Sequence, residues 1–228
     1  MLKLIRLEWK KNRIGKYIRS AFILTGILFL LLFAVAGELG SDETRLFYGT
    51  DMLGAGVEMF TNLSFMIFAS VMLSSFIVGT YKDKTIHLMF SYPISRRMIL
   101  GAQMAAVWIF GFTALALSKI VIYACLVAVK RFAYISADNI ALGSGAFYVR
   151  ILVDSAVMIS IGFVSLLVGM LTKLSKATII AGVVVVCLTQ GNIGSYTLTG
   201  NIPFYAVLLC ISAASVILSL CRVETRDV

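Results

Sequence analysis

The residue most able to do chemistry in this sequence is a lysine deep within an apolar stretch. Lys119 has hydrophobic residues on both sides over residues 98–129. A charged side chain at the centre of a bilayer costs roughly 2.5–3.5 kcal/mol on insertion scales, so it needs a partner, a cavity or access to the membrane surface. Asp154 and Glu58, near the starts of two other apolar stretches, are the available carboxylates. We expect Lys119 to meet one of them and help shape a path through the membrane, or else to snorkel outward without that role.

Other groups able to do chemistry are sparse. The apolar stretches contain no pair of catalytic carboxylates and no nucleophile–base set, and the single histidine, His87, lies between two of them. The GxxxxGK[ST] signature that cradles nucleotide phosphates is absent. No cysteines form a CxxC pair, which argues against a zinc site, and we expect buried free thiols. We therefore expect this chain to bind no cofactor and to be no enzyme. The cysteines are Cys125, Cys187, Cys210 and Cys221.

The composition is that of an integral membrane protein. Of the 228 residues, 60% are hydrophobic and only 14% are charged, and the mean hydropathy is +0.98. A soluble chain of this composition would expose large apolar patches. The net charge of +9 is not gathered on one polar domain, so we attribute it to Lys and Arg on the cytoplasmic side of a membrane and not to nucleic-acid binding.

Six apolar runs are long enough to be candidate membrane helices, since about 20 residues cross a hydrocarbon core of about 30 Å. We expect the third run to begin in the membrane interface, to tilt, or to break near Gly111, because it exceeds one straight crossing. The fifth run is short, and Gly182, Gly191 and Gly194 predict a thin or irregular outer end. The runs are residues 20–37, 57–80, 98–129, 149–171, 177–190 and 203–220.

Positive charge alternates between the gaps that separate these runs. With the N-terminus in the cytoplasm, fifteen Lys and Arg residues fall inside and four outside, with Lys119 within a run. The positive-inside rule then predicts an all-α membrane protein, a single transmembrane domain of six crossings with both termini cytoplasmic. A cleaved signal peptide ending at residues 34–36 is the alternative for the first run. The full length of that run favours a retained helix.

Residues 1–19 form a pattern of their own. Basic residues recur at helical spacing beside an apolar stripe, as in a helix that lies in the membrane interface with its basic face toward anionic lipid. Trp9 would then lie in the headgroup zone. A charge cluster that only sets topology is the alternative, and the two are compatible. The basic face has Lys3, Arg6, Lys10 and Arg13, and the stripe has Leu2, Ile5 and Trp9.

The segment 81–97, YKDKTIHLMFSYPISRR, is too polar to cross a membrane and too apolar for a solvated loop. Ile86, Met89 and Phe90 fall at i, i+3 and i+4, which gives a short helix one apolar face. Pro93 ends that helix, because the residue before a proline avoids the helical region. Such a helix can dock into a groove on a partner protein, or it can rest on lipid.

This segment resembles part of a known transporter family. Thr85-Ile86, the run Ser91–Arg96 and Ile99 are similar to the segment of type-2 ABC exporter permeases that commonly reads GTI…L…PISR…I…K. The opening Leu4–Lys11 also resembles that family's N-terminal interfacial helix. With six crossings and both ends inside, the resemblance covers essentially the whole chain. Two positions depart from the pattern: Thr80 replaces a common acidic residue, and Lys84 replaces the usual glycine.

The resemblance implies a multi-pass permease subunit of the cell membrane, in the bacterial plasma membrane. It would form a dimer with a second copy or a homologous permease, and each would pair with a separate cytoplasmic ATPase subunit that binds ATP and Mg. The segment 81–97 would be the coupling helix between the second and third crossings. The residues carried over to the ATPase contact are Thr85, Ile86, Met89, Phe90, Pro93 and Arg96.

The substrate and the transport class allow several hypotheses. Short outer loops and apolar helices favour a small amphipathic peptide, such as a bacteriocin or a modulin-like toxin, over a polymer; antibiotics and other drugs are also carried by this family. An ion-coupled secondary transporter would need protonatable groups near the midplane. A non-transporting membrane anchor or sensor would need a partner helix but no cavity. Small residues four apart could permit close helix packing; they are Ala102/Ala106, Ser70/Ser74 and Ala177/Ala181.

Overall fold

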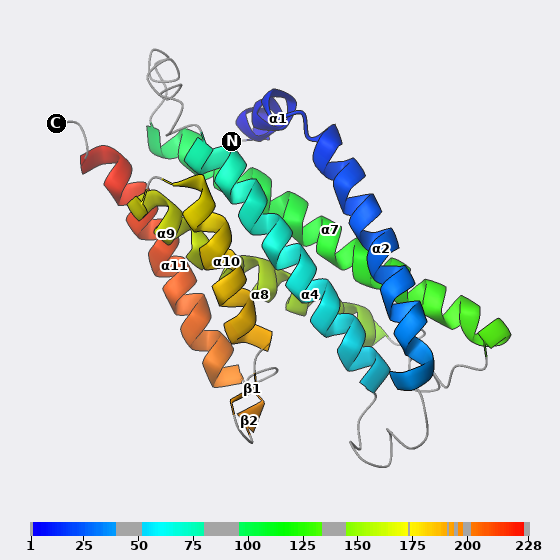
Figure 1. Cartoon of the computed structure of the whole chain (residues 1–228). Helices are drawn as coiled ribbons and strands as arrows, with labels where there is room; N and C mark the ends of the chain where they lie inside the picture. Colours follow the sequence, from blue (N-terminus) through cyan, green and yellow to red (C-terminus); the bar gives the residue numbers. More distant parts are fainter. Residues whose placement is uncertain are drawn as a thin grey trace. The chain divides into compact units, whose positions relative to one another are not determined.

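The computed structural model describes residues 2–39, 52–79, 96–133, 145–172, 174–190, 192–193, 196–197 and 202–225. This part of the chain is helical apart from one short hairpin (Figure 1). The helices are α1 Leu2–Lys11, α2 Gly15–Leu39, α4 Met52–Leu73, the π-helix η1 Ser74–Val78, α7 Arg96–Ala133, α8 Gly145–Gly162, α9 Val164–Thr172, α10 Ser175–Gln190 and α11 Ile202–Thr225. The strands are β1 Asn192–Ile193 and β2 Tyr196–Thr197.

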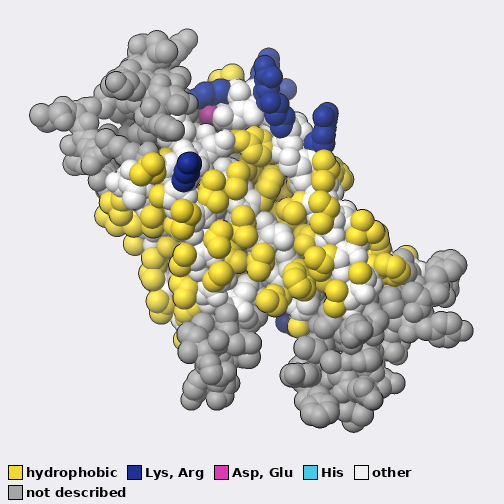
Figure 2. Space-filling model, viewed as in Figure 1, with side chains coloured by type: hydrophobic (Ala, Val, Ile, Leu, Met, Phe, Trp, Pro, Cys, Tyr) yellow, Lys and Arg dark blue, Asp and Glu magenta, His cyan; other side chains and the backbone are white. Residues whose placement is uncertain are grey.

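Five helical stretches of the described residues are long and apolar enough to cross a membrane. The face of the protein seen in Figure 2 is accordingly covered mostly by hydrophobic side chains. Apart from the hairpin, the described part of the chain is therefore that of a helical membrane protein, as the composition predicts. The stretches are Gly15–Val35, Gly54–Val78, Met98–Ala128, Gly145–Thr172 and Pro203–Leu220, and they coincide with five of the six predicted spans.

The remaining predicted span, residues 177–190, corresponds to α10. This helix has 16 residues, which is shorter than the length needed for a straight crossing. The antiparallel hairpin follows it, with Asn192 opposite Thr197 and Ile193 opposite Tyr196. An irregular outer end was expected here, but the all-α prediction omitted this hairpin. A sixth crossing and the cytoplasmic location of both termini remain predictions.

Contacts between residues divide the chain into two compact units. Unit 1 comprises Met1–Ile14, Phe65–Phe112 and Ala156–Val228, and unit 2 comprises Gly15–Ser64 and Thr113–Ser155. Within unit 1, α9 contacts both α10 and α11, and α10 also contacts η1. The single transmembrane domain expected from the sequence remains a prediction.

The N-terminal helix ends earlier than expected. α1 ends at Lys11, and residues 15–19, which were assigned to the interfacial helix, begin α2 instead. Arg13 takes a left-handed conformation with a φ of 49°. The Ile14 N–H donates to the Trp9 carbonyl at 3.1 Å and the Arg13 N–H donates to the Lys10 carbonyl at 3.3 Å. This is the Schellman pattern of helix termination, in which glycine usually holds the position of Arg13.

The apolar stripe of α1 packs on α7. Ile5 is buried with Ala102 and Ala106, and the half-buried Trp9 packs against this cluster. The Trp9 indole N–H donates to the Ala106 carbonyl at 3.3 Å. Two small residues four positions apart let the helices approach closely, as expected for Ala102/Ala106. Ile5 and Trp9 of the stripe thus face protein, while contact of the basic face with anionic lipid remains a prediction.

α7 is continuous over 38 residues, so the alternative of a break near Gly111 is wrong. The glycine serves close packing: a Cβ at Gly111 would lie 3.3 Å from the Ile159 Cδ1 atom of α8. At about 1.5 Å per residue α7 is about 57 Å long. This exceeds the hydrocarbon thickness of about 30 Å, which supports tilting or extension into the interface.

The fourth predicted span, residues 149–171, is broken at Phe163. The Phe163 N–H donates to the Ser160 carbonyl at 3.1 Å, and the Leu166 N–H donates to the Phe163 carbonyl at 3.0 Å. These i to i+3 bonds replace the regular helical ladder between α8 and α9. Gly162 and nearby Ser165 are the residue types at which helices commonly kink. The sequence carried that signal, but hydropathy alone did not reveal it.

Small and hydroxyl-bearing residues bring α4, η1, α9 and α10 close together. The Ser165 hydroxyl donates to the Ser70 hydroxyl at 3.3 Å, and the Ser74 hydroxyl donates to the Ser175 carbonyl at 2.9 Å. A Cβ at Gly182 would lie 2.1 Å from Ser70 Oγ and 2.5 Å from Ser70 Cβ. The Ser70/Ser74 pair therefore lies at a helix contact, as expected. Ala177 and Ala181 are only half-buried.

We predict that Gly182→Ala lowers the midpoint of thermal unfolding in lipid nanodiscs, with a cost of about 1–3 kcal/mol, because the added methyl overlaps Ser70. Gly26→Ala is the matched control, since a Cβ at Gly26 meets nothing within 4 Å and alanine favours the helix. Ser70→Gly should restore part of the loss in the Gly182→Ala background. Equal midpoints for the two glycine variants would contradict this packing.

Arg13→Gly should increase the protection of α1 amides in hydrogen exchange. Glycine removes left-handed strain of about 1 kcal/mol, partly offset by its greater freedom in the unfolded chain. Arg19→Gly removes the same charge within α2. It should not raise the protection of α1 amides and should lower that of α2 amides, because glycine costs about 1 kcal/mol in a helix interior. A loss of protection in both variants would rule out the proposed role of residue 13.

Candidate functional site

Lys119 and Asp154 form a buried ion pair within unit 2. The Lys119 ammonium, on α7, donates to Asp154 Oδ2 on α8. The Lys119 side chain is 1% exposed and that of Asp154 is 24% exposed. Asp154 is one of the two carboxylates that the sequence offered as a partner, and burial of the ammonium excludes the snorkelling alternative. Asp154 is the partly exposed member of the pair, so its carboxylate is the group that a molecule outside the pair can contact.

The two residues lie at matching depths in their helices. Lys119 precedes the end of its span at Ala128 by nine residues, and Asp154 follows the start of its span at Gly145 by nine residues. Nine residues correspond to about 14 Å of helix. Both groups are therefore well inside the apolar stretch, where an unpaired charge is costly.

Asn62 is the third member of the site, and the sequence reasoning missed it. Its Nδ2 group donates to Asp154 Oδ2 at 3.2 Å, so the oxygen that accepts from Lys119 also accepts from an amide. Asn62 is 3% exposed. An amide within the apolar run 57–80, four residues after Glu58, was the available signal. We refer to Lys119, Asp154 and Asn62 as the polar triad.

Glu58 lies on α4 one helical turn before Asn62, and it pairs with Arg150. Its Oε1 atom is 3.9 Å from Arg150 Nε, with side-chain exposures of 31% for Glu58 and 77% for Arg150. Glu58 precedes Asn62 by four residues on α4, and Arg150 precedes Asp154 by four on α8. The two helices thus run parallel here, with one exposed and one buried pair on successive turns. Glu58 does not contact Lys119.

Buried polar atoms near the triad retain hydrogen-bonding capacity. Asn62 Oδ1 and the hydroxyls of Ser118 and Ser155 have no partner among the described residues. Ser118 and Ser155 adjoin Lys119 and Asp154 in sequence. An amide oxygen accepts hydrogen bonds, and a serine hydroxyl both donates and accepts. Asn62 Oδ1 is thus an unpaired buried acceptor within the triad, and a role of the triad in translocation remains a prediction.

The predicted coupling residues cannot be placed in the same way. Thr85, Ile86, Met89, Phe90 and Pro93 lie outside the described residues, as does His87. Arg96 is the first residue of α7. Among the described residues, no three His, Cys, Asp or Glu side chains gather in a manner that could hold a metal ion.

The prediction of buried thiols is wrong for two cysteines. Cys187 and Cys210 are exposed, and Cys125 is half-buried. A small hydrophobic thiol can face lipid as readily as protein, because the exterior of a membrane protein is itself apolar. Hydrophobicity therefore does not separate inside from outside in such a chain.

Comparison with known proteins yields one partial match. The uncharacterised protein YcbO of Bacillus subtilis (strain 168) is 32% identical over 123 residues, which are 54% of this chain and 54% of YcbO. The chain thus spans about half the length of this curated relative. No protein-family model matches the sequence, and no solved structure matches it.

We predict that Asp154→Asn destabilises the protein by about 3–5 kcal/mol, because it leaves the buried Lys119 charge uncompensated. Lys119→Met should cost less, since the remaining Asp154 carboxylate is partly exposed. The double variant Lys119→Met/Asp154→Leu should recover most of the loss. Thermal unfolding in nanodiscs measures all three.

Arg150→Met is the control for this series, since it breaks an exposed pair worth at most about 1 kcal/mol. If Asp154→Asn were no more destabilising than Arg150→Met, the polar triad would not be a buried, coupled unit. A double variant less stable than Asp154→Asn would contradict the pairing itself.

Proposed function

We propose that this chain is the permease subunit of an ATP-driven ABC exporter of the type-2 class. Two copies, or one copy and a homologous permease, would enclose the translocation path, and separate cytoplasmic ATPase subunits would bind ATP and Mg. The observation that best supports this proposal is the packing of α1 on the start of α7. The resemblance of the segment 81–97 to a coupling helix supports it independently.

The contact of α1 with α7 suits the transmission of force. Ile5 and Trp9 meet Ala102 and Ala106, which lie in the first three turns of the helix that follows the segment 81–97. An interfacial helix whose basic face contacts lipid headgroups, as predicted for α1, would resist displacement out of the interface plane. A movement of the coupling segment would therefore act on α7 where α1 braces it. α7 is continuous over 38 residues, so it could carry such a movement along its length.

The polar triad belongs to this proposal as a part of the path. Lys119 lies on the same continuous helix as the α1 contact. A displacement of α7 along or about its axis would strain the bond between Lys119 and Asp154, and the unpaired oxygen of Asn62 offers an alternative acceptor. We propose a small amphipathic peptide as the substrate, whose polar groups could replace these contacts during passage.

An ion-coupled secondary transporter is the second candidate. Such a transporter needs ionisable groups within the membrane, and the buried pair of Lys119 and Asp154 meets that requirement. The two candidates differ in their energy source. In proteoliposomes with the cognate ATPase, peptide uptake driven by ATP without an ion gradient supports the exporter, whereas uptake driven by a gradient without ATP supports the alternative.

The double variant Met89→Asp/Phe90→Asp tests the coupling assignment. It places two charges on the apolar face of the proposed coupling helix, and we expect loss of ATPase co-purification, or at least a tenfold loss of peptide-stimulated ATP hydrolysis, as for an apolar hot spot worth about 2 kcal/mol. Leu46→Asp/Phe47→Asp is the matched control, because it makes the same change in the predicted outer loop.

A complex of full activity in the Met89→Asp/Phe90→Asp variant would contradict the coupling assignment. Lys119→Met tests the role of the triad in the path independently of the coupling contact. We expect this variant to co-purify with the ATPase but to lose the stimulation of ATP hydrolysis by the peptide. Unchanged transport in Lys119→Met would remove the triad from the path and leave the coupling assignment standing.

A further inference from the structure

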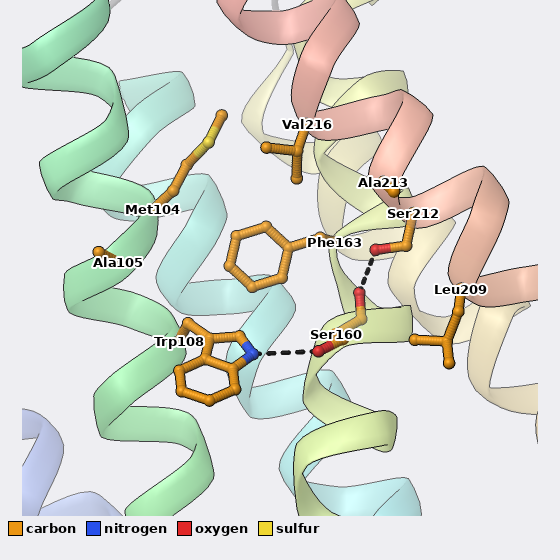
Figure 3. Close-up of a pocket in the computed structure, with 9 residues that line it drawn as sticks. All are labelled: Met104, Ala105, Trp108, Ser160, Phe163, Leu209, Ser212, Ala213 and Val216. Atoms are coloured by element: carbon orange, nitrogen blue, oxygen red, sulfur yellow. Dashed lines mark hydrogen bonds between the residues drawn. The ribbon is translucent and has the colours of Figure 1, made fainter.

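Unit 1 contains a cavity of about 400 Å³ between α7, α11 and the break that separates α8 from α9 (Figure 3). Trp108 lines one side, Ser212 and Ala213 line the other, and the Phe163 ring projects between them. Ala213 is exposed, so the cavity is accessible from outside the described chain. Its volume lies within the range typical of ligand pockets, about 300–1,000 Å³.

The polar groups at this cavity bond to one another. The Trp108 indole N–H donates to Ser160 Oγ at 3.1 Å, and that hydroxyl donates to the Ala156 carbonyl at 2.7 Å. The Ser212 hydroxyl donates to the Ser160 carbonyl, which the helix break leaves with an i+3 partner only. None of the lining residues is charged. The lining therefore offers a ligand an essentially apolar wall.

The cavity lies near the middle of three spans. Trp108 is ten residues into Met98–Ala128, Ser160 is fifteen into Gly145–Thr172, and Ser212 is nine into Pro203–Leu220. Each of the three lies at least eight residues, or about 12 Å, from either end of its span, a depth at which the surrounding medium is lipid hydrocarbon. Phe163, the residue at the break, lines the cavity and is 4% exposed.

We propose that this cavity binds an acyl chain of a bilayer phospholipid. An alkyl chain brings no polar group, and so loses nothing at a wall whose donors are already engaged. An extended peptide segment would bring backbone N–H and C=O groups that this wall cannot satisfy, and the wall has no partners for the polar face of an amphipathic peptide helix. The site is thus distinct from the polar triad, and its occupancy does not depend on the proposed export function.

The test uses Trp108 as a reporter of the bound chain. In a Trp9→Phe background, Trp108 is the remaining tryptophan. The full chain is reconstituted in vesicles of phosphatidylcholine with increasing fractions of a lipid brominated in the middle of one acyl chain. We expect Trp108 fluorescence to be quenched, and Ala213→Phe to reduce the quenching at least about twofold, because a filled site excludes the brominated carbons.

Ala214→Phe is the matched control, since Ala214 is exposed on α11 but does not line the cavity. Ala105→Leu fills the cavity from α7 and provides a second filled variant in case Ala213→Phe does not fold. Circular dichroism verifies the helical content of every variant. Equal quenching in Ala213→Phe, Ala105→Leu and Ala214→Phe would mean contact with surrounding lipid only and would overturn the proposal. Release of quenching by added peptide, or by dimer formation at constant lipid composition, would assign the site to a different occupant and would also overturn it.

Discussion

The absence of water in a bilayer is the constraint on which this structure depends. Polar groups within the spans must find partners inside the protein, and the exterior must be apolar. α11 illustrates both requirements: Ser212, Ser215 and Ser219 are buried, whereas Ile211 and Ile217 are exposed. This distribution is the reverse of that in a soluble amphipathic helix. The same requirement forces Lys119 onto a carboxylate, and it lets hydroxyls and glycines, more than large apolar side chains, determine where helices meet.

Hydropathy averaged over about 20 residues predicts the positions of the long helices. The apolar runs gave the five long helices to within a few residues, because spanning length is set by the membrane thickness. Average hydropathy did not predict where individual helices break or end. The break at Phe163 and the termination of α1 after Lys11 follow from hydrogen bonds of single backbone groups, to which a 20-residue average is insensitive. Asn62 escaped because an isolated amide in an apolar run acquires meaning only when Asp154 is known to lie beside it.

α7 connects the features from which function was inferred. Its first turns receive α1, its middle forms one wall of the acyl-chain cavity through Trp108, and Lys119 follows eleven residues later on the same helix. The polar triad and the apolar cavity both use residues of this helix, but they differ in how fully their polar groups are paired. The triad leaves the Asn62 amide oxygen unpaired, whereas the donors at the cavity are engaged.

The central claim is that the segment 81–97 and the C-terminus share the side on which ATP is hydrolysed. Labelling of single cysteines by a membrane-impermeant maleimide, in a chain whose native cysteines are replaced by alanine, tests it directly. Leu88→Cys and Asp227→Cys should react only from the cytoplasmic side, and Thr44→Cys and Thr199→Cys only from the outer side. Reaction of Leu88→Cys from outside would contradict the coupling role, and opposite sides for Leu88→Cys and Asp227→Cys would show an odd number of crossings between them, against the even number that this account requires.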